Sequence, residues 1–156
     1  MMQRISVSFQ ADGNLGPFEE RFVVNVDRPD VLPMMIKVGG EVAGSFTVAP
    51  SALWLGNTRG LSESKARLLV SCDSGVLRLD GLEIDSSGWR VSHTVGEIKD
   101  SPRHIPIDPR IQAPNVTGFL ETFPRIKVSR GHEAATLIVP VTASVTATDQ
   151  KGATDP

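Results

Sequence analysis

Apolar and polar residues alternate along most of this chain. Because successive side chains of a strand point to opposite faces, alternation predicts half-buried β-strands. Three such segments precede residue 45, at residues 5–9, 21–26 and 34–42. Residues 11–17 and 27–30 are rich in Gly, Pro, Asn and Asp and predict turns between them. Gly39 and Gly40 inside the third segment indicate a bulge or a close backbone approach.

The same pattern continues to the end of the chain. Alternating segments lie at residues 46–48, 53–55, 66–72, 77–84, 89–93, 105–107, 119–128 and 135–145. Residues 56–60 predict a turn, and residues 62–67 tolerate a helix, although the period of two favours a strand. Ile105 and Ile107 stand among prolines, which predicts a short edge strand. About ten short strands without a confident helix predict an all-β antiparallel sandwich or barrel.

Two parts of the chain resemble each other at a spacing near 100 residues. Gly16 and Gly118 are 102 positions apart, and so are Val26 and Val128. Ile36, Val38 and Val42 precede Val139, Val141 and Val145 by 103 positions each. Chance alignment of two amphipathic strand pairs is the alternative explanation. The shared order of glycine, strand, turn and strand favours an internal repeat of immunoglobulin-like size.

The repeat predicts how the chain is divided. We expect residues 45–147 to form a complete Ig-like antiparallel β-sandwich of about seven strands, preceded by the last three strands of a similar repeat in residues 1–44. Residues 148–156 are polar and are expected to be a disordered tail. Three strands cannot cover their own apolar face. Residues 1–44 are therefore expected to belong to a longer array, to pack on another chain, or to extend the edge of the complete module.

Residues 50–60, PSALWLGNTRG, resemble the opening of a bacterial Ig-like repeat of the DUF1573 type and of the related ASH and major-sperm-protein-like modules. Residues 16–18, 27–30 and 36–42 resemble the closing half of the same repeat. The resemblance implies a seven-stranded sandwich, a bacterial extracytoplasmic or surface setting, and no enzymatic activity. The Cys-Gly-Cys motif of many members is absent, and so are the second Cys and the Tyr of antibody domains. We therefore expect an aliphatic core around Trp89.

Composition narrows the possible partners. The formal net charge is −2, from 16 basic and 18 acidic side chains spread along the chain. Such a balance argues against a nucleic-acid surface and against a polybasic membrane patch. No apolar segment is long enough for a transmembrane helix, and the first residues show no signal peptide. The localisation therefore stays open apart from the setting that the resemblance implies.

Little in the sequence points to catalysis or to a cofactor. The three histidines are too far apart for metal-ligand spacing, and the single Cys72 on an apolar strand face is expected in the core. The carboxylates of residues 80–85 predict a solvated face. A loose calcium site using Asp27, Asp30 or Asp85 is a remaining alternative. We expect no catalytic residue, no cofactor and no metal.

Four apolar residues are candidates for an interface with a partner. Phe22, Val24 and Ile36 lie on the predicted apolar face of residues 1–44, and Trp54 points away from Leu53 and Leu55. We expect residues 1–44 to cover Trp54, with a partner anchor as the alternative. The predicted function is a non-enzymatic structural or protein-interaction module that contacts adjacent Ig-like repeats or another protein. The alternative is a carbohydrate- or ligand-binding sandwich with an exposed Trp, and a hydrolase domain is a third possibility.

Overall fold

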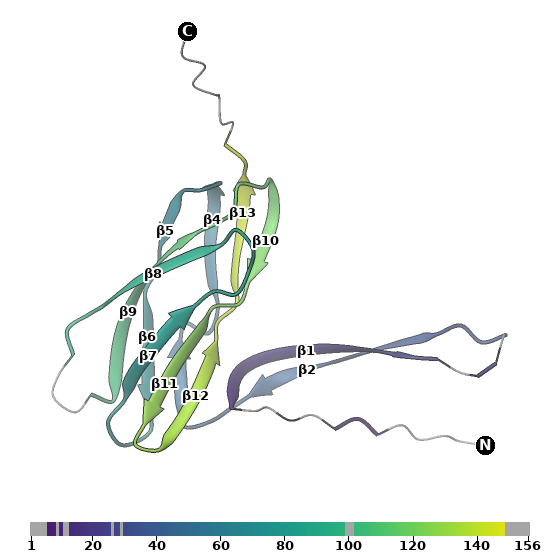
Figure 1. Ribbon diagram of the computed structural model, residues 1–156, viewed down its shortest axis with the longest axis horizontal. Coiled ribbons are helices and arrows are strands. Elements are labelled where there is room, and N and C mark those ends of the chain that lie inside the picture. The colour runs from purple at the N-terminus through teal and green to yellow at the C-terminus, as the bar shows by residue number, and fades with distance from the viewer. Residues whose placement is uncertain are drawn as a thin grey trace, which may run out of the picture.

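The computed structural model describes residues 6–8, 10, 13–25, 27–28, 30–98 and 102–148. This part of the chain contains thirteen strands and no helix, so it has no helix that could cross a membrane. It divides into a β-sandwich and a long hairpin made of β1 (Asn14–Val24) and β2 (Met34–Val42). In Figure 1 the hairpin projects sideways from the lower end of the elongated sandwich.

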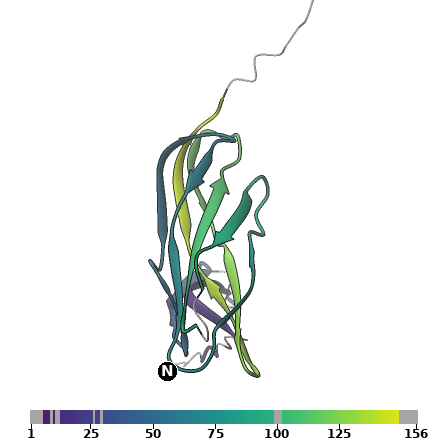
Figure 2. The ribbon, with the colours of Figure 1, turned by 90° about the vertical axis from the view of Figure 1, so that its left-hand side faces the viewer.

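The sandwich has two layers, which Figure 2 shows from the side. The first contains β3 (Phe46–Ala49), β5 (Glu63–Lys65), β6 (Leu68–Cys72), β8 (Arg90–Val95) and β9 (His104–Gln112). The second contains β4 (Leu53–Arg59), β7 (Arg78–Glu83), β10 (Gly118–Thr122), β11 (Arg125–Arg130), β12 (Glu133–Ile138) and β13 (Val141–Thr146). β5 and β6 follow one another along one edge of β9, and β8 pairs with its other edge.

Short interruptions divide seven long strands into these eleven. β3 and β4 separate at residues 50–52, where the chain crosses from the first layer to the second, and β5 and β6 separate at residues 66–67. Pro124 interrupts β10 and β11, and Pro140 interrupts β12 and β13, because proline has no N–H for the ladder. The predicted single strands at 119–128 and 135–145 are therefore wrong in detail. The predicted seven-stranded Ig-like sandwich is confirmed.

Apolar residues from the facing layers form the core. The lower cluster lies between β3, β6 and β9 on one side and β11 and β12 on the other, and it includes the predicted core residue Cys72. The upper cluster lies between β8 and β9 and the strands β4, β10 and β13. Trp89 is buried in the upper cluster, as predicted. The core is mainly aliphatic, with Phe46 and Trp89 as its buried aromatic residues in the described part of the chain.

β9 is central in its layer, so the prediction of a short edge strand at residues 105–107 is wrong. The N–H and C=O groups of a strand residue point to the same edge. The Pro106 carbonyl accepts from Gly96, one residue beyond β8, and the Pro109 carbonyl accepts from Ala66, between β5 and β6. The two missing donors therefore face positions where a neighbouring strand has ended. A central strand tolerates its prolines in this way.

The structure also differs from several other local predictions. β1 begins at Asn14, inside the predicted turn at residues 11–17. β4 continues through Gly56, whose positive φ of 74° accompanies a register shift against β13, so no turn begins there. Residues 62–67 are not helical. Ile5 and Phe9 of the first predicted strand, Val26, and residues 149–156 of the predicted tail lie outside the described residues, and residues 6–8 are not in a strand.

Core burial predicts a stability difference between two apolar positions. Ile107→Ala removes a side chain that is 0% exposed, so we expect a loss of about 2–5 kcal/mol in the free energy of unfolding. Leu69→Ala, on the outer face of β6, is the matched control and is expected to cost less than about 1 kcal/mol. Urea unfolding followed by Trp fluorescence measures both values. Equal losses would contradict the assignment of inner and outer faces.

Candidate functional site

The hairpin of β1 and β2, here called the arm, is the strongest candidate site. Its strands pair in one antiparallel register from Gly16–Val42 at the base to Val24–Met34 near the tip. In the described part of the chain, β2 pairs with β1 alone, and β1 also pairs with β12 at its first two residues. Figure 1 shows the arm standing clear of the sandwich along most of its length. None of the other described strands covers either face of the arm along that length.

One face of the arm carries charged side chains. Arg21 Nη2 lies 3.0 Å from Glu19 Oε1, and Lys37 Nζ lies 2.6 Å from Glu19 Oε2. The hydrogen bond from Lys37, followed by that from Arg21, lowers the pKa of Glu19 below its ordinary value. Exposed ion pairs of this kind add little stability. They keep this face of the arm hydrated.

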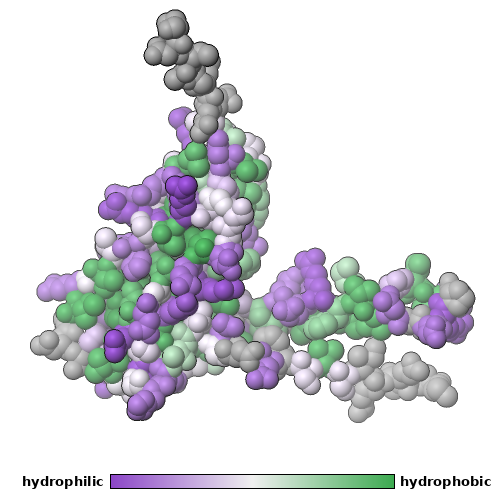
Figure 3. All heavy atoms as spheres, viewed as in Figure 1, coloured by the Kyte–Doolittle hydropathy of each residue, from purple (hydrophilic) through white to green (hydrophobic). Residues whose placement is uncertain are grey.

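The opposite face is mainly apolar, with Glu20 as an exception, and it contains three of the predicted interface residues. Phe22 pairs with Ile36 across the hairpin, and Val24 pairs with Met34. Phe22, Val24 and Ile36 are half-buried, while Met34 is 59% exposed. Apolar residues are visible along the arm in Figure 3. The structure thus brings Phe22, Val24 and Ile36 together, but places Trp54 elsewhere.

Gly39 and Gly40 mark a close approach within the arm. A Cβ at Gly40 would lie 3.0 Å from the Phe18 ring, and one at Gly39 would lie 3.3 Å from the Phe18 carbonyl oxygen. The register does not shift at these residues, so there is no bulge. Of the two predicted explanations, the close approach is the correct one.

A tight joint attaches the arm to the sandwich. Asn14 and Leu15 pair in parallel with Thr136 and Leu137, and the Thr136 N–H donates to the Gly13 carbonyl at 3.1 Å. Leu15 also packs against the lower core.

Two glycines allow this close contact. A Cβ at Gly16, whose φ is +116°, would lie 2.7 Å from the Ile138 carbonyl oxygen. A Cβ at Gly44 would lie 2.9 Å from the Leu15 side chain. The joint therefore depends on the absence of a side chain at Gly16, where the contact is with backbone, whereas the Leu15 side chain could move to accommodate a Cβ at Gly44.

The arm has the same strand register as the hairpin formed by β10–β11 and β12–β13. Adding 102 to the number of a β1 residue and 103 to the number of its partner in β2 gives two residues that are also paired in the sandwich. Gly16–Val42 falls on Gly118–Val145, Phe18–Gly40 on Leu120–Ala143, and Val24–Met34 on Ile126–Leu137. Gly16 and Gly118 both have positive φ. The arm thus has the same strand pairing as the sandwich's last hairpin at these positions.

The tips of the two hairpins carry corresponding ion pairs. Arg28 Nη2 lies 2.6 Å from Asp30 Oδ2 in the arm, and the hydrogen bond from Arg28 lowers the pKa of Asp30. At the same offsets, Arg130 pairs with Glu133 in the sandwich. Arg130 also pairs with Asp73 and lies 5.5 Å from the ring centroid of Phe46. Among the described residues, the arm's arginine has the local partner but no counterpart of the contacts with Asp73 and Phe46.

Trp54 is largely exposed, so the expected cover by residues 1–44 is not found among the residues that the structure describes. Its side chain is 58% exposed, and its ring stacks on Phe119 with centroids 6.0 Å apart. Trp54 lies beside Thr142 of β13, and Phe119 lies beside Ser144. Trp54 and Phe119 form an exposed aromatic pair on the outer face of the second layer.

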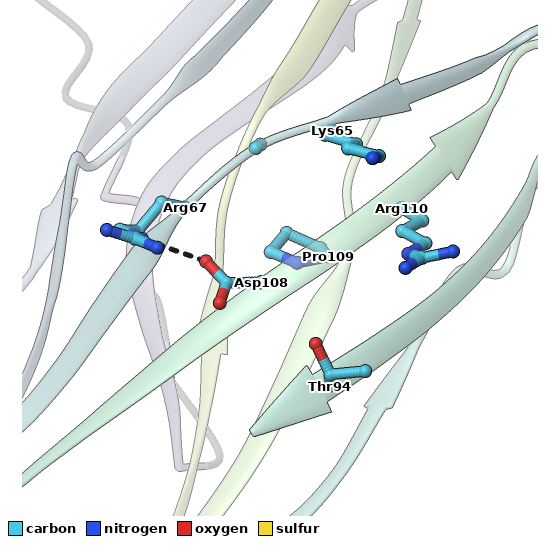
Figure 4. Close-up of a pocket in the computed structure, with 7 residues that line it drawn as sticks. Lys65, Arg67, Thr94, Asp108, Pro109 and Arg110 are labelled. Atoms are coloured by element: carbon cyan, nitrogen blue, oxygen red, sulfur yellow. Dashed lines mark hydrogen bonds and ion pairs between the residues drawn. The ribbon is translucent and has the colours of Figure 1, made fainter. Parts of the chain in front are cut away.

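An open hollow of about 510 Å³ lies over β9 between β5 and β8. Figure 4 shows Lys65, Arg67, Asp108 and Arg110 around it, with Arg67 Nε 2.9 Å from Asp108 Oδ1. Arg110 Nη1 lies 3.5 Å from a carboxylate oxygen of Glu63. Because its arginines are exposed and already paired with carboxylates, the hollow is a solvated charged face rather than a specific anion site.

The remaining candidate groups do not converge. His104 Nδ1 lies 2.9 Å from Ser71 Oγ, whereas His93 lines a different hollow beside Leu77 and Ile105. Across the residues that the structure describes, no group of three or more His, Cys, Asp or Glu could hold a metal ion. The carboxylates of residues 80–85 are exposed, and two of them pair with Lys127 and Arg125.

Sequence reasoning missed two features of these surfaces. It did not pair Phe119 with Trp54, because the two residues are 65 positions apart and meet only across β13. It did not find the joint between β1 and β12, since Asn14 and Leu15 stand in a stretch with turn composition. The repeat offsets were the available signal for the joint, because they align Gly16 with a strand residue.

Sequence comparisons with known proteins do not assign the chain to a family. No protein-family model matches the chain, and no curated protein sequence matches it. Membership of the DUF1573 family therefore stays a prediction.

Several solved structures are similar to part of the chain. The ASH/PapD-like domain of human CEP192 (PapD-like domain 7) has a TM-score of 0.46 and 11% identity, covering 67% of this chain and 87% of that one. The Vibrio cholerae VesB protease has a TM-score of 0.43 and 10% identity, covering 64% and 32%. Domains 4 and 5 of the S-layer protein SbsC have a TM-score of 0.36 and 12% identity, covering 82% and 58%. Similarity at this level carries no argument about function.

The geometry of the joint predicts the effect of Gly16→Ala. A Cβ at this position meets a backbone oxygen at 2.7 Å in a strained conformation, so the parallel pairing with β12 is expected to loosen. Amide hydrogen exchange at Thr136, which donates to Gly13, is expected to accelerate by about tenfold or more. Gly118→Ala is the matched control, because its φ is also positive, its Cβ would meet nothing within 4 Å, and it lies outside the joint. Unchanged exchange in Gly16→Ala would contradict the proposed role of the glycine.

Proposed function

We propose that this protein is a non-enzymatic Ig-like module of a repeat array, which acts as a spacer and binds a neighbouring unit through the arm. The observation that carries the proposal is the shared register of the arm and the sandwich's last hairpin. A hairpin with that register and one apolar face is the closing part of a sandwich. It needs a second layer to cover it.

The apolar side chains of the arm are less buried than their equivalents in the sandwich. Ile126 and Val139 are 0% exposed in the sandwich, whereas their equivalents Val24 and Ile36 are half-buried and Met34 is mostly exposed. Complete burial of an aliphatic side chain contributes about 1.5–3 kcal/mol. Covering this face therefore supplies a favourable free energy of association. The charged face with Glu19 and Lys37 remains suited to solvent.

The joint supports a role as a spacer. Residues 43–45 alone separate β2 from β3, and the β1–β12 pairing adds a second connection between the arm and the sandwich. Two connections restrain rotation more than a single flexible linker does. A unit completed by the arm would be held at a defined orientation to the sandwich.

The non-enzymatic part of the proposal is supported by the arrangement of reactive groups. Cys72 is buried in the core, His104 contacts Ser71, and His93 lines a separate hollow beside Leu77 and Ile105. The bacterial extracytoplasmic or surface setting is supported only by the sequence resemblance, and we include it in the proposal on that basis.

The proposal predicts that the uncovered arm associates. We expect the chain to self-associate reversibly as its concentration increases, because apolar faces of two arms can cover each other. Phe22→Asp/Ile36→Asp is expected to weaken this association by about tenfold or more, since a buried unpaired carboxylate is costly. Sedimentation velocity over a range of concentrations measures the effect.

The matched control for this experiment is Val23→Asp/Met35→Asp, which places the same charges on the opposite face of the same strands. We expect it to associate like the unmodified chain. A chain that stays monomeric at all concentrations and binds no hydrophobic dye would contradict an interaction role for the arm. Equal loss in both variants would show a charge effect without preference for either face.

The exposed Trp54 supports a second candidate, a carbohydrate-binding surface. Trp54 and Phe119 present aromatic rings beside the hydroxyl-bearing residues Thr142 and Ser144 of β13. Aromatic faces bind the apolar faces of sugars, and neighbouring hydroxyl groups bond to sugar hydroxyls. The mutual stacking of the two rings competes with this role. We therefore rank the candidate below the interaction module.

Titration with a panel of soluble oligosaccharides tests this second candidate. Binding would change the fluorescence of the exposed Trp54, while the buried Trp89 serves as an internal reference. Trp54→Ala is expected to reduce affinity by about tenfold, or 1.4 kcal/mol. Binding that Trp54→Ala leaves unchanged, or no binding by any member of the panel, would count against it.

A further inference from the structure

We infer that the partner of the arm is an incomplete Ig-like sandwich that lacks its last hairpin and supplies strands to both edges of the arm. This inference rests on the proposed function and specifies the partner of the same surface. The partner places a parallel strand along β2, an antiparallel strand along the outer half of β1, and a sheet over the apolar face. Each contact follows from the equivalent hairpin in the sandwich.

The free edge of β2 corresponds to the edge of β13 that holds β4. β4 pairs in parallel with β13, with Leu53 opposite Val141 and Thr58 opposite Val145. The offset of 103 places Val38 and Val42 at these two positions in β2. Among the described residues, β2 has no strand on this edge. An unpaired edge of this kind binds an extended segment through main-chain hydrogen bonds.

The half of β1 near the tip of the arm corresponds to β11, the strand that pairs with β7. β7 pairs antiparallel with β11, with Glu83 opposite Arg125 and Leu82 opposite Ile126. The offset of 102 places Val23 and Val24 at these positions. The base of β1 is already paired with β12, so the two contacts do not compete for the same residues.

The partner's sheet would cover the apolar face of the arm in the same way as β3, β6 and β9 cover the inner face of β11 and β12. Most positions of the arm's face are apolar like their equivalents in the sandwich. Val24 corresponds to Ile126, and Ile36 corresponds to Val139. The exception is Glu20, which falls on the buried Thr122. Thr122 Oγ1 donates to Ser86 Oγ at 2.8 Å. The inferred partner therefore needs a hydrogen-bond donor, such as a serine hydroxyl, opposite Glu20.

A segment of this chain supplies a probe with the required strands. Residues 45–117 contain β3 to β9, including the parallel strand β4, the antiparallel strand β7 and the donor Ser86. The probe is refolded in the presence of the complete chain, and amide exchange is measured in β1 and β2. We expect a complex with one probe per chain, in which the β2 amides exchange at least about tenfold more slowly.

Three matched chains decide the outcome. The unmodified chain and Met35→Asp, on the charged face of β2, are expected to bind the probe, whereas Ile36→Asp, on the apolar face, is expected to lose the protection. Absence of protection in the unmodified chain, or equal protection in all three, would overturn the inference. If the arm self-associates but does not bind the probe, the proposed interaction role stands and only this partner is wrong. If it does neither, both proposals fail.

Discussion

The requirement that an apolar sheet face be covered by a second layer governs this structure. In the sandwich, the hairpin of β10–β11 and β12–β13 meets this requirement, because β3, β6 and β9 bury its inner face. The arm repeats the register of that hairpin and presents an equivalent face without a described sheet against it. One hairpin is therefore a core element, and the other is in our proposal a binding surface, although the two share the same strand register.

Prolines and glycines determine how the strands are divided and how closely they approach. Pro124 and Pro140 interrupt two long strands at neighbouring points, where the Val139 N–H donates to the Pro124 carbonyl. Gly16 and Gly44 allow the arm to meet the sandwich closely. They fix where the arm leaves the sandwich and hence where a neighbouring unit would be held.

Charged residues support this arrangement without forming a reactive site. In the sandwich, Arg130 connects the hairpin tip with Asp73 and lies over Phe46, so it links the two layers. The hydrogen bond from Arg130 also lowers the pKa of Asp73. The equivalent Arg28 has only its neighbour Asp30 among the described ion pairs. The comparison indicates which contacts a facing layer would add to the arm.

The sequence by itself determined the strand periodicity, the seven-stranded class, the buried Trp89 and the repeat offsets, because each depends on residue type and local spacing. It also predicted the shared apolar face of Phe22, Val24 and Ile36. Tertiary structure alone decided that β9 is central, since its prolines are tolerated only where neighbouring strands end. It likewise decided that Trp54 meets Phe119 and that β1 joins β12, because both contacts connect residues far apart in sequence. Alternation specifies which face of a strand is buried, but the identity of the neighbour depends on how the whole chain is arranged.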